Sequence, residues 1–183
     1  MTTALLLVDL QNDYFAGGAM PLVGTDAAAT QAARLLTRFR ADGRPLVHVR
    51  HLSLRPGATF FLPGTPGAEI HATLHPLPGE PVIEKNFPNS FRDTDLQPLL
   101  QQLGVEALLI CGAMSHMCID TTTRAAFDLG YRCSVAADAC ATRDLEFTGH
   151  RVAAADVQAA FMAALAVPFA RVETAAALLE GLA

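Results

Sequence analysis

The chain of 183 residues is 51% apolar and 17% charged, with a net charge of −5 and a mean hydropathy of +0.30. This composition predicts one compact domain over 1–183, because disorder requires low hydrophobicity and high charge. An isoelectric point near 5.6 argues against nucleic-acid binding, and no apolar stretch approaches the roughly 20 residues that span a bilayer. The first residues lack the pattern of a secretory signal, so we expect a cytoplasmic protein.

Short apolar runs alternate with helical segments along the chain, without repeats or linkers. The first run, 4–8, is unbroken and ends in acids, which is typical of a buried strand. The stretch 51–79 is rich in Pro and Gly and predicts a long functional loop. Further strands are expected at 46–50, 81–85, 107–111, 133–137 and 170–173, and helices at 26–41, 94–103, 118–129, 150–166 and 175–182. Apolar strands separated by helices indicate a doubly wound α/β domain with a parallel sheet.

Three reactive side chains lie at or just beyond the carboxyl ends of the expected strands, namely Asp9, Lys85 and Cys118. In doubly wound folds the ligand binds outside this edge of the sheet. The coincidence of an acid, an amine and a thiol there makes this edge the candidate site.

Each of the three also has an ordinary structural interpretation. Cys118 follows a strand-to-helix turn, where the helix N-terminus favours a thiolate, but a buried Cys is as often a small core residue. Asp9 is either a general base, whose pKa depends on burial and on a nearby cation, or a structural acid that accepts backbone N–H groups. For Asp13 we favour the structural role. Lys85 is either an ordinary surface cation or a lysine with a specific chemical role in the site. Because the other twelve bases are all Arg, the single compact ammonium favours the second interpretation.

The remaining cysteines show neither a C-x-x-C pair nor zinc-finger spacing, so we expect neither disulfides nor a structural metal. Cys111 and Cys133 lie inside expected strands and are assigned to the core. Cys140 follows a strand, and its role stays open.

Several motifs occur in order along nearly the whole chain. They are Val-Asp-Leu-Gln-Asn-Asp-Tyr at 8–14, Gly-Thr-Pro-Gly-Ala-Glu-Ile at 64–70, Glu84-Lys85 with Phe91, Gly-Ala-Met-Ser-His-Met-Cys at 112–118, Thr122, Ala125, Ala126, Gly130-Tyr131 and Asp138-Ala139. With these motifs the sequence resembles the isochorismatase-like hydrolases, and within them the cysteine hydrolase branch.

The resemblance implies a Rossmann-like three-layer domain, with a six-stranded parallel sheet of order 3-2-1-4-5-6 covered by helices on both faces. It also implies a catalytic triad of Asp9, Lys85 and Cys118, a cis peptide between Ala113 and Met114, and an oxyanion hole formed by the N–H groups of Met114 and Cys118. A homo-oligomer is a further implication. Since the third strand is not next to the first in this order, either Lys85 reaches across or its strand bends inward.

The nicotinamidase branch carries an Asp-x-His pair after the second strand, whereas this chain has Val-Arg-His-Leu-Ser at 49–53. We therefore predict no metal and no other cofactor, and nicotinamide becomes a weaker candidate substrate. His71 and His75 are interpreted as solvated loop residues. The candidate pocket residues are Gln11, Tyr14, His51, Asn86, Phe87, Phe91 and His116, with Phe60 and Phe61 as further candidate walls.

The expected activity is hydrolysis of a C–N bond in a small amide, ureido compound or lactam, through a thioester on Cys118 with Asp9 as general base. Two alternatives stay open. One is vinyl ether hydrolysis of the isochorismatase type, which needs no thiol. The other is a non-catalytic, oligomeric interaction module, since a fold alone does not guarantee turnover.

Overall fold

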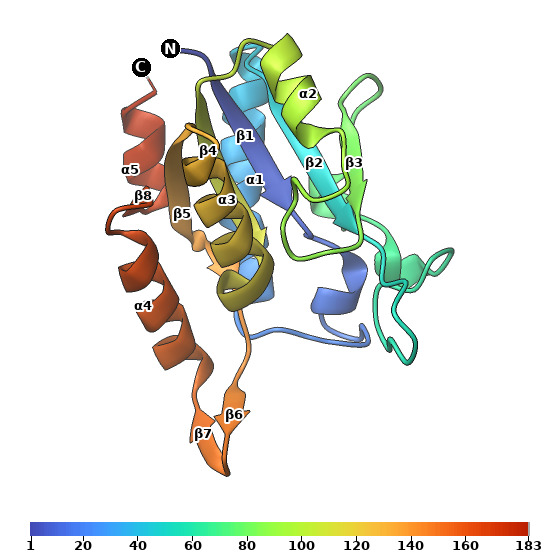
Figure 1. Cartoon of the computed structure of the whole chain (residues 1–183). Helices are drawn as coiled ribbons and strands as arrows, with labels where there is room; N and C mark the ends of the chain where they lie inside the picture. The colour runs from blue at the N-terminus through green and yellow to red at the C-terminus, as the bar shows by residue number, and fades with distance from the viewer. Residues whose placement is uncertain (183) are drawn as a thin grey trace.

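The computed structural model describes residues 1–182, which form one parallel sheet between two layers of helices (Figure 1). The strands of the sheet are β1 (Thr3–Val8), β2 (Leu46–His51), β3 (Val82–Lys85), β4 (Ala107–Ala113), β5 (Arg132–Ala141) and β8 (Ala170–Glu173). Their order is β3-β2-β1-β4-β5-β8, and all neighbours pair in parallel. The predicted fold class and strand order are confirmed, with β8 as the sixth strand.

The sheet divides the apolar interior into two clusters, because successive residues of a strand face opposite sides. Leu5 and Leu7 of β1 pack with α1 (Thr25–Ala41) and α5 (Ala175–Glu180). Leu6 and Val8 lie on the other side, in the cluster that includes residues of α2 (Leu96–Gln102) and α4 (Ala154–Leu165). Helix α3 (Asp120–Asp128) adds to the same layer. Both faces of the central strands are therefore buried, which explains their unbroken apolar sequences.

The segment before α4 differs from the prediction of a helix over 150–166. Residues His150–Val152 form strand β7, which pairs with β6 (Leu145–Phe147) in an antiparallel hairpin that extends away from the sheet (Figure 1). Thr148 and Gly149 between the strands have φ values of 50° and 77°, as a tight two-residue hairpin turn requires. Helix α4 begins only at Ala154, whose N–H donates to the Asp144 carboxylate at 2.8 Å.

Strand β5 and the helix after β4 also have other bounds than expected. β5 continues to Ala141, beyond the predicted end at 137. The helix predicted from 118 is a π-helical turn, η4 (Ser115–Ile119), followed by α3. Short 3-10 turns are η1 (Asn12–Tyr14), η2 (Pro66–Ala68) and η3 (Ala72–Leu74). None of the helices within residues 1–182 is long and apolar enough to cross a membrane.

Candidate active site

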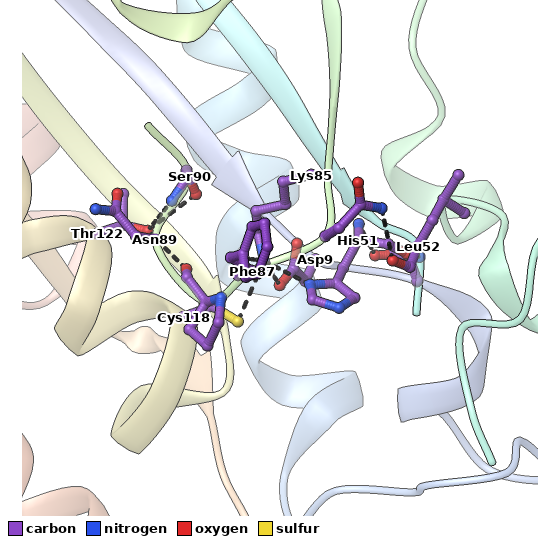
Figure 2. Close-up of polar contacts among 12 residues, drawn as sticks. Asp9, His51, Leu52, Lys85, Phe87, Asn89, Ser90, Cys118 and Thr122 are labelled. Carbon is purple, nitrogen blue, oxygen red and sulfur yellow. Dashed lines mark hydrogen bonds and ion pairs between the residues drawn. The ribbon is translucent and has the colours of Figure 1, made fainter. Parts of the chain in front are cut away.

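Asp9, Lys85 and Cys118 meet at the carboxyl edge of the sheet (Figure 2). Asp9 follows β1, Lys85 is the last residue of β3, and Cys118 lies in η4 after β4. The Lys85 Nζ lies 2.7 Å from Asp9 Oδ2 and 3.2 Å from Cys118 Sγ. All three side chains are buried, with exposures of 0% for Asp9, 1% for Lys85 and 5% for Cys118. The structure thus joins three residues that are far apart in the sequence.

Lys85 reaches the others across the end of the strand between them. Its own strand keeps regular parallel pairing with β2 up to the pair His51↔Lys85. Two strand spacings, about 10 Å, separate β3 from β1. The lysine side chain covers part of this distance and passes His51, whose Nδ1 lies 2.9 Å from Nζ. The alternative in which β3 bends inward is not what the structure shows.

The Lys85 ammonium has a fourth partner in the carbonyl of Phe87, which accepts its hydrogen bond at 3.1 Å. Burial by itself would lower the pKa of Lys85, but the negative charge of Asp9 and the contact with Cys118 Sγ outweigh burial and raise this pKa. Lys85 is therefore charged, and it supplies the positive charge of the site.

Asp9 has an unusual backbone and few polar partners. Its φ is 53°, in the left-handed region that only a few per cent of non-glycine residues adopt. Within residues 1–182, neither carboxylate oxygen accepts a hydrogen bond beyond the ion pair with Lys85. Asp13, in contrast, accepts the N–H groups of Ala19 at 3.1 Å and Phe61 at 2.6 Å. The structural interpretation is confirmed for Asp13, and it is wrong for Asp9.

The Cys118 thiol is protonated in the resting site. Burial and the nearby charge of Asp9 raise its pKa strongly, and the opposing effect of Lys85 is smaller. The thiol therefore needs a base when it reacts. The Asp9 carboxylate is the acidic side chain that contacts the same ammonium, and it accepts no competing hydrogen bond from the part of the chain that the structure describes.

The backbone before Cys118 is tightly constrained. The peptide bond between Ala113 and Met114 is cis, and Gly112 has a φ of 128°. A Cβ atom on Gly112 would lie 1.9 Å from the Val8 carbonyl oxygen, so no other residue fits there. The Met114 carbonyl accepts the N–H groups of Met117 and Ile119, but not that of Cys118 between them. Turns of the π type occur frequently at functional sites.

A cavity of about 270 Å³ opens onto the Cys118 thiol. Four of the predicted pocket residues line it, namely Tyr14, His51, Asn86 and Phe87, as does the candidate wall Phe60. Met114, which was predicted for the oxyanion hole, also lines the cavity, and the lining residues that were not predicted are Ser53, Leu54, Arg55, Pro88 and Met117. In the sequence, the Pro- and Gly-rich loop 51–79 was the signal for Ser53, Leu54 and Arg55.

Three predicted pocket residues do not line the cavity. The Gln11 amide is buried and donates to the carbonyls of His51 and Ala68, and its oxygen accepts the His51 N–H. Phe91 stacks on Tyr131, with ring centroids 6.1 Å apart. His116 Nδ1 lies 2.6 Å from the hydroxyl of Thr142. Internal hydrogen bonds and packing hold these side chains, so Gln11 positions His51 rather than facing the cavity. Phe61, a further candidate wall, also lies behind the lining, against the Tyr14 ring at 4.5 Å.

A metal ion would need donor atoms that already face the ammonium. Ligand atoms of Asp9, His51 and Cys118 lie within 4.8 Å of one another. Each of these residues also has an atom within 3.2 Å of Lys85 Nζ. A cation bound by this set would have to displace Lys85, so the residues do not fit a metal.

The chain is similar to known proteins along nearly its whole length. Residues 3–176 match the family model of the Isochorismatase domain. The chain is 51% identical over 180 residues to the uncharacterized isochorismatase family protein YddQ of Bacillus subtilis, covering 98% of this chain and 100% of that protein. It is 39% identical over 143 residues to a streptothricin hydrolase of Streptomyces noursei, covering 78% of this chain and 50% of that protein. A crystal structure from Oleispira antarctica, provisionally assigned as an isochorismatase hydrolase, has a TM-score of 0.95 and 56% identity over 98% of this chain and 97% of that one.

Proposed function

Because this chain belongs to the isochorismatase family of hydrolases, we propose that it is a cysteine hydrolase that cleaves a C–N bond of a small amide, ureido compound or lactam. The observation that carries the proposal is the buried Lys85 ammonium, which contacts both the Asp9 carboxylate and the Cys118 thiol. A base, a cation and a nucleophile within hydrogen-bond reach are the parts that covalent hydrolysis needs. The similarity to a protein named streptothricin hydrolase supports hydrolysis as the reaction class.

In the first half-reaction Asp9 accepts the thiol proton as Cys118 Sγ attacks the carbonyl carbon, and Lys85 stabilises the thiolate. The N–H groups of Met114 and Cys118 stabilise the oxyanion of the tetrahedral intermediate. Asp9 then gives the proton to the leaving nitrogen, the C–N bond breaks, and a thioester remains on Cys118.

In the second half-reaction water attacks the thioester and Asp9 accepts its proton. The C–S bond breaks, the thiol is protonated again, and the carboxylic acid leaves. One water is consumed for each C–N bond cleaved, and no redox partner or metal takes part.

The test is a Cys118→Ala variant assayed for ammonia or amine release from a panel of amides, ureido compounds and lactams. We expect activity to fall at least about 10³-fold, because the nucleophile is lost. Intact mass spectrometry of the quenched wild-type protein should show an acyl adduct on Cys118. The control is Cys133→Ala, another buried cysteine near the start of β5, which should retain activity.

Three outcomes would overturn the assignment. An adduct on Cys140 would show that the nucleophile is wrong. Activity of Cys118→Ala on isochorismate, without amide turnover by the wild type, would favour vinyl ether hydrolysis instead. No turnover of any compound in the panel would favour a non-catalytic module.

A further inference from the structure

The wall of the cavity carries one permanently charged side chain, Arg55. The other lining residues beside the site are largely apolar or aromatic, such as Phe60, Phe87 and Met117. Within residues 1–182 the Arg55 guanidinium forms neither an ion pair nor a hydrogen bond, whereas Arg40, for example, forms two hydrogen bonds with Glu80. An arginine at a cavity mouth without a carboxylate partner is available to a ligand.

The other charges around the cavity do not neutralise the positive charge of Arg55. Asp9 and Lys85 neutralise each other, and the Cys118 thiol is uncharged at rest. His51 is also neutral, because burial lowers its pKa to about 4. The charge of Arg55 reaches His51, where it helps to lower this pKa. The cavity therefore has a net positive charge, which favours an anionic ligand.

Ser53 places a hydroxyl on the same wall as Arg55. It lines the cavity, is only 8% exposed, and its hydroxyl has no hydrogen-bond partner within residues 1–182. The Ser53 N–H donates to the Phe61 carbonyl at 2.9 Å, which fixes this part of the loop. The hydroxyl faces the cavity side of the loop, where it is free to donate a hydrogen bond to a bound ligand.

We infer that Arg55 and Ser53 form a carboxylate subsite, so that the substrate is a small amide or ureido compound with an anionic end. This inference rests on the proposed function, since it places the scissile carbonyl at Cys118 and the carboxylate at Arg55. The cavity has the size for a small substrate, because 270 Å³ corresponds to the volume of about nine water molecules. Guanidinium and carboxylate groups form paired, charge-assisted hydrogen bonds.

The test compares the binding of succinamate with that of succinamide, its uncharged analogue of nearly equal size. Both are titrated calorimetrically into a Cys118→Ser variant, in which turnover does not complicate the measurement. We expect succinamate to bind about tenfold more tightly at low salt, as a partly exposed charged contact allows. The preference should decrease as the ionic strength rises.

Arg55→Gln in the same background should remove most of the preference, and Ser53→Ala should reduce it about threefold. The matched control is Arg132→Gln at the opposite, amino end of β5, an exposed arginine that likewise forms no ion pair within the described chain. It should leave the preference unchanged. Equal affinity for both probes, no binding of either, or an unchanged preference in Arg55→Gln would each overturn the subsite.

These outcomes are distinct from those that decide the reaction. If the charge preference is present but no wild-type acyl adduct forms on Cys118, the subsite stands and the proposed chemistry fails. If amides are hydrolysed through the adduct without a charge preference, the chemistry stands and the subsite fails.

Discussion

The ammonium of Lys85 has only three protons to donate, yet it contacts polar atoms of four residues, which are Asp9, His51, Phe87 and Cys118. Its geometry is compact, and the planar fork of a guanidinium cannot reproduce it. The Lys85→Arg variant should therefore fold, yet lose at least about 100-fold in kcat/KM for an amide substrate. Circular dichroism checks the fold and a steady-state assay checks the loss. Full activity would mean that any cation suffices.

Removing the charge of Lys85 has a different effect. In Lys85→Met the buried Asp9 carboxylate loses its ion-pair partner, which should cost about 3 to 5 kcal/mol of unfolding free energy. The double variant Asp9→Asn, Lys85→Met removes both charges and should recover most of this stability while staying inactive. Urea denaturation of the three proteins gives the comparison. Equal stability of Lys85→Met and the wild type would contradict the charged pair.

His51 makes stability depend on pH. Its pKa in the folded protein is about 4, below the ordinary 6.5, chiefly because of burial. The unfolded chain therefore binds this proton more readily, so the stability that the neutral imidazole contributes is complete above pH 6.5 and is lost as the pH falls towards 4. Between about pH 7 and about pH 4.5 the loss should reach roughly 2 kcal/mol.

Urea denaturation at both pH values measures this loss. His51→Asn lacks the titrating group and should show a smaller difference between the two conditions than the wild type. The exposed loop residue His75, replaced by Asn, serves as the control and should retain the wild-type difference. The same pH dependence in His51→Asn and the wild type would show that another group is responsible.

The sequence predicted the chemical core of the site better than its walls. Asp9 and Cys118 follow buried apolar strands, Lys85 ends a short edge strand, and the fold brings the carboxyl ends of these strands together. Arg55 and Ser53 lie on an irregular loop, whose path no periodic pattern encodes. Gln11 stands two residues after Asp9, yet its amide serves the loop backbone instead of the cavity. Side-chain direction in loops depends on tertiary hydrogen bonds, which a single sequence does not specify.

Among the elements, β1 and β4 approach each other closely at the pair Val8↔Gly112. Because a Cβ at this position would lie 1.9 Å from the Val8 oxygen, Gly112→Ala should push the strand ends apart and destabilise the protein by about 3 kcal/mol or more. Gly130→Ala is the matched control. It also has a positive φ, of 92°, but nothing lies within 4 Å of its added methyl group, so only about 1 kcal/mol should be lost. Thermal denaturation compares the two, and equal losses would contradict the steric explanation.

The elements themselves were predictable where burial shapes the sequence. Residues of β1 and β4 are buried on both faces and form long apolar runs. The hairpin of β6 and β7 has only three residues in each strand and is largely exposed, so its sequence carries no clear alternation. Its Thr148-Gly149 turn directly precedes the predicted start of the helix and pairs residues 150–152 with β6 instead. The error over 150–152 therefore arose from local turn chemistry.

Over the whole molecule, the long loop is fastened near both of its ends. Near its beginning, the Gln11 amide donates a hydrogen bond to the His51 carbonyl and accepts one from the His51 N–H. At its end, Glu80 pairs with Arg40 of α1 at 2.7 Å and contacts His48 of β2 at 2.9 Å. The cavity wall at 53–55 thus belongs to a segment tied to the sheet, which suits a preformed pocket. Homo-oligomer formation stays a prediction.

The left-handed backbone of Asp9 and its buried ion pair with Lys85 have an evolutionary consequence. Replacing such a buried pair with apolar residues of similar volume is often neutral or stabilising, and a strained backbone position costs about 1 to 3 kcal/mol. Drift toward greater stability would therefore tend to erase this arrangement in a chain that served only as a scaffold. Selection for turnover, rather than for folding, is the pressure that would maintain it.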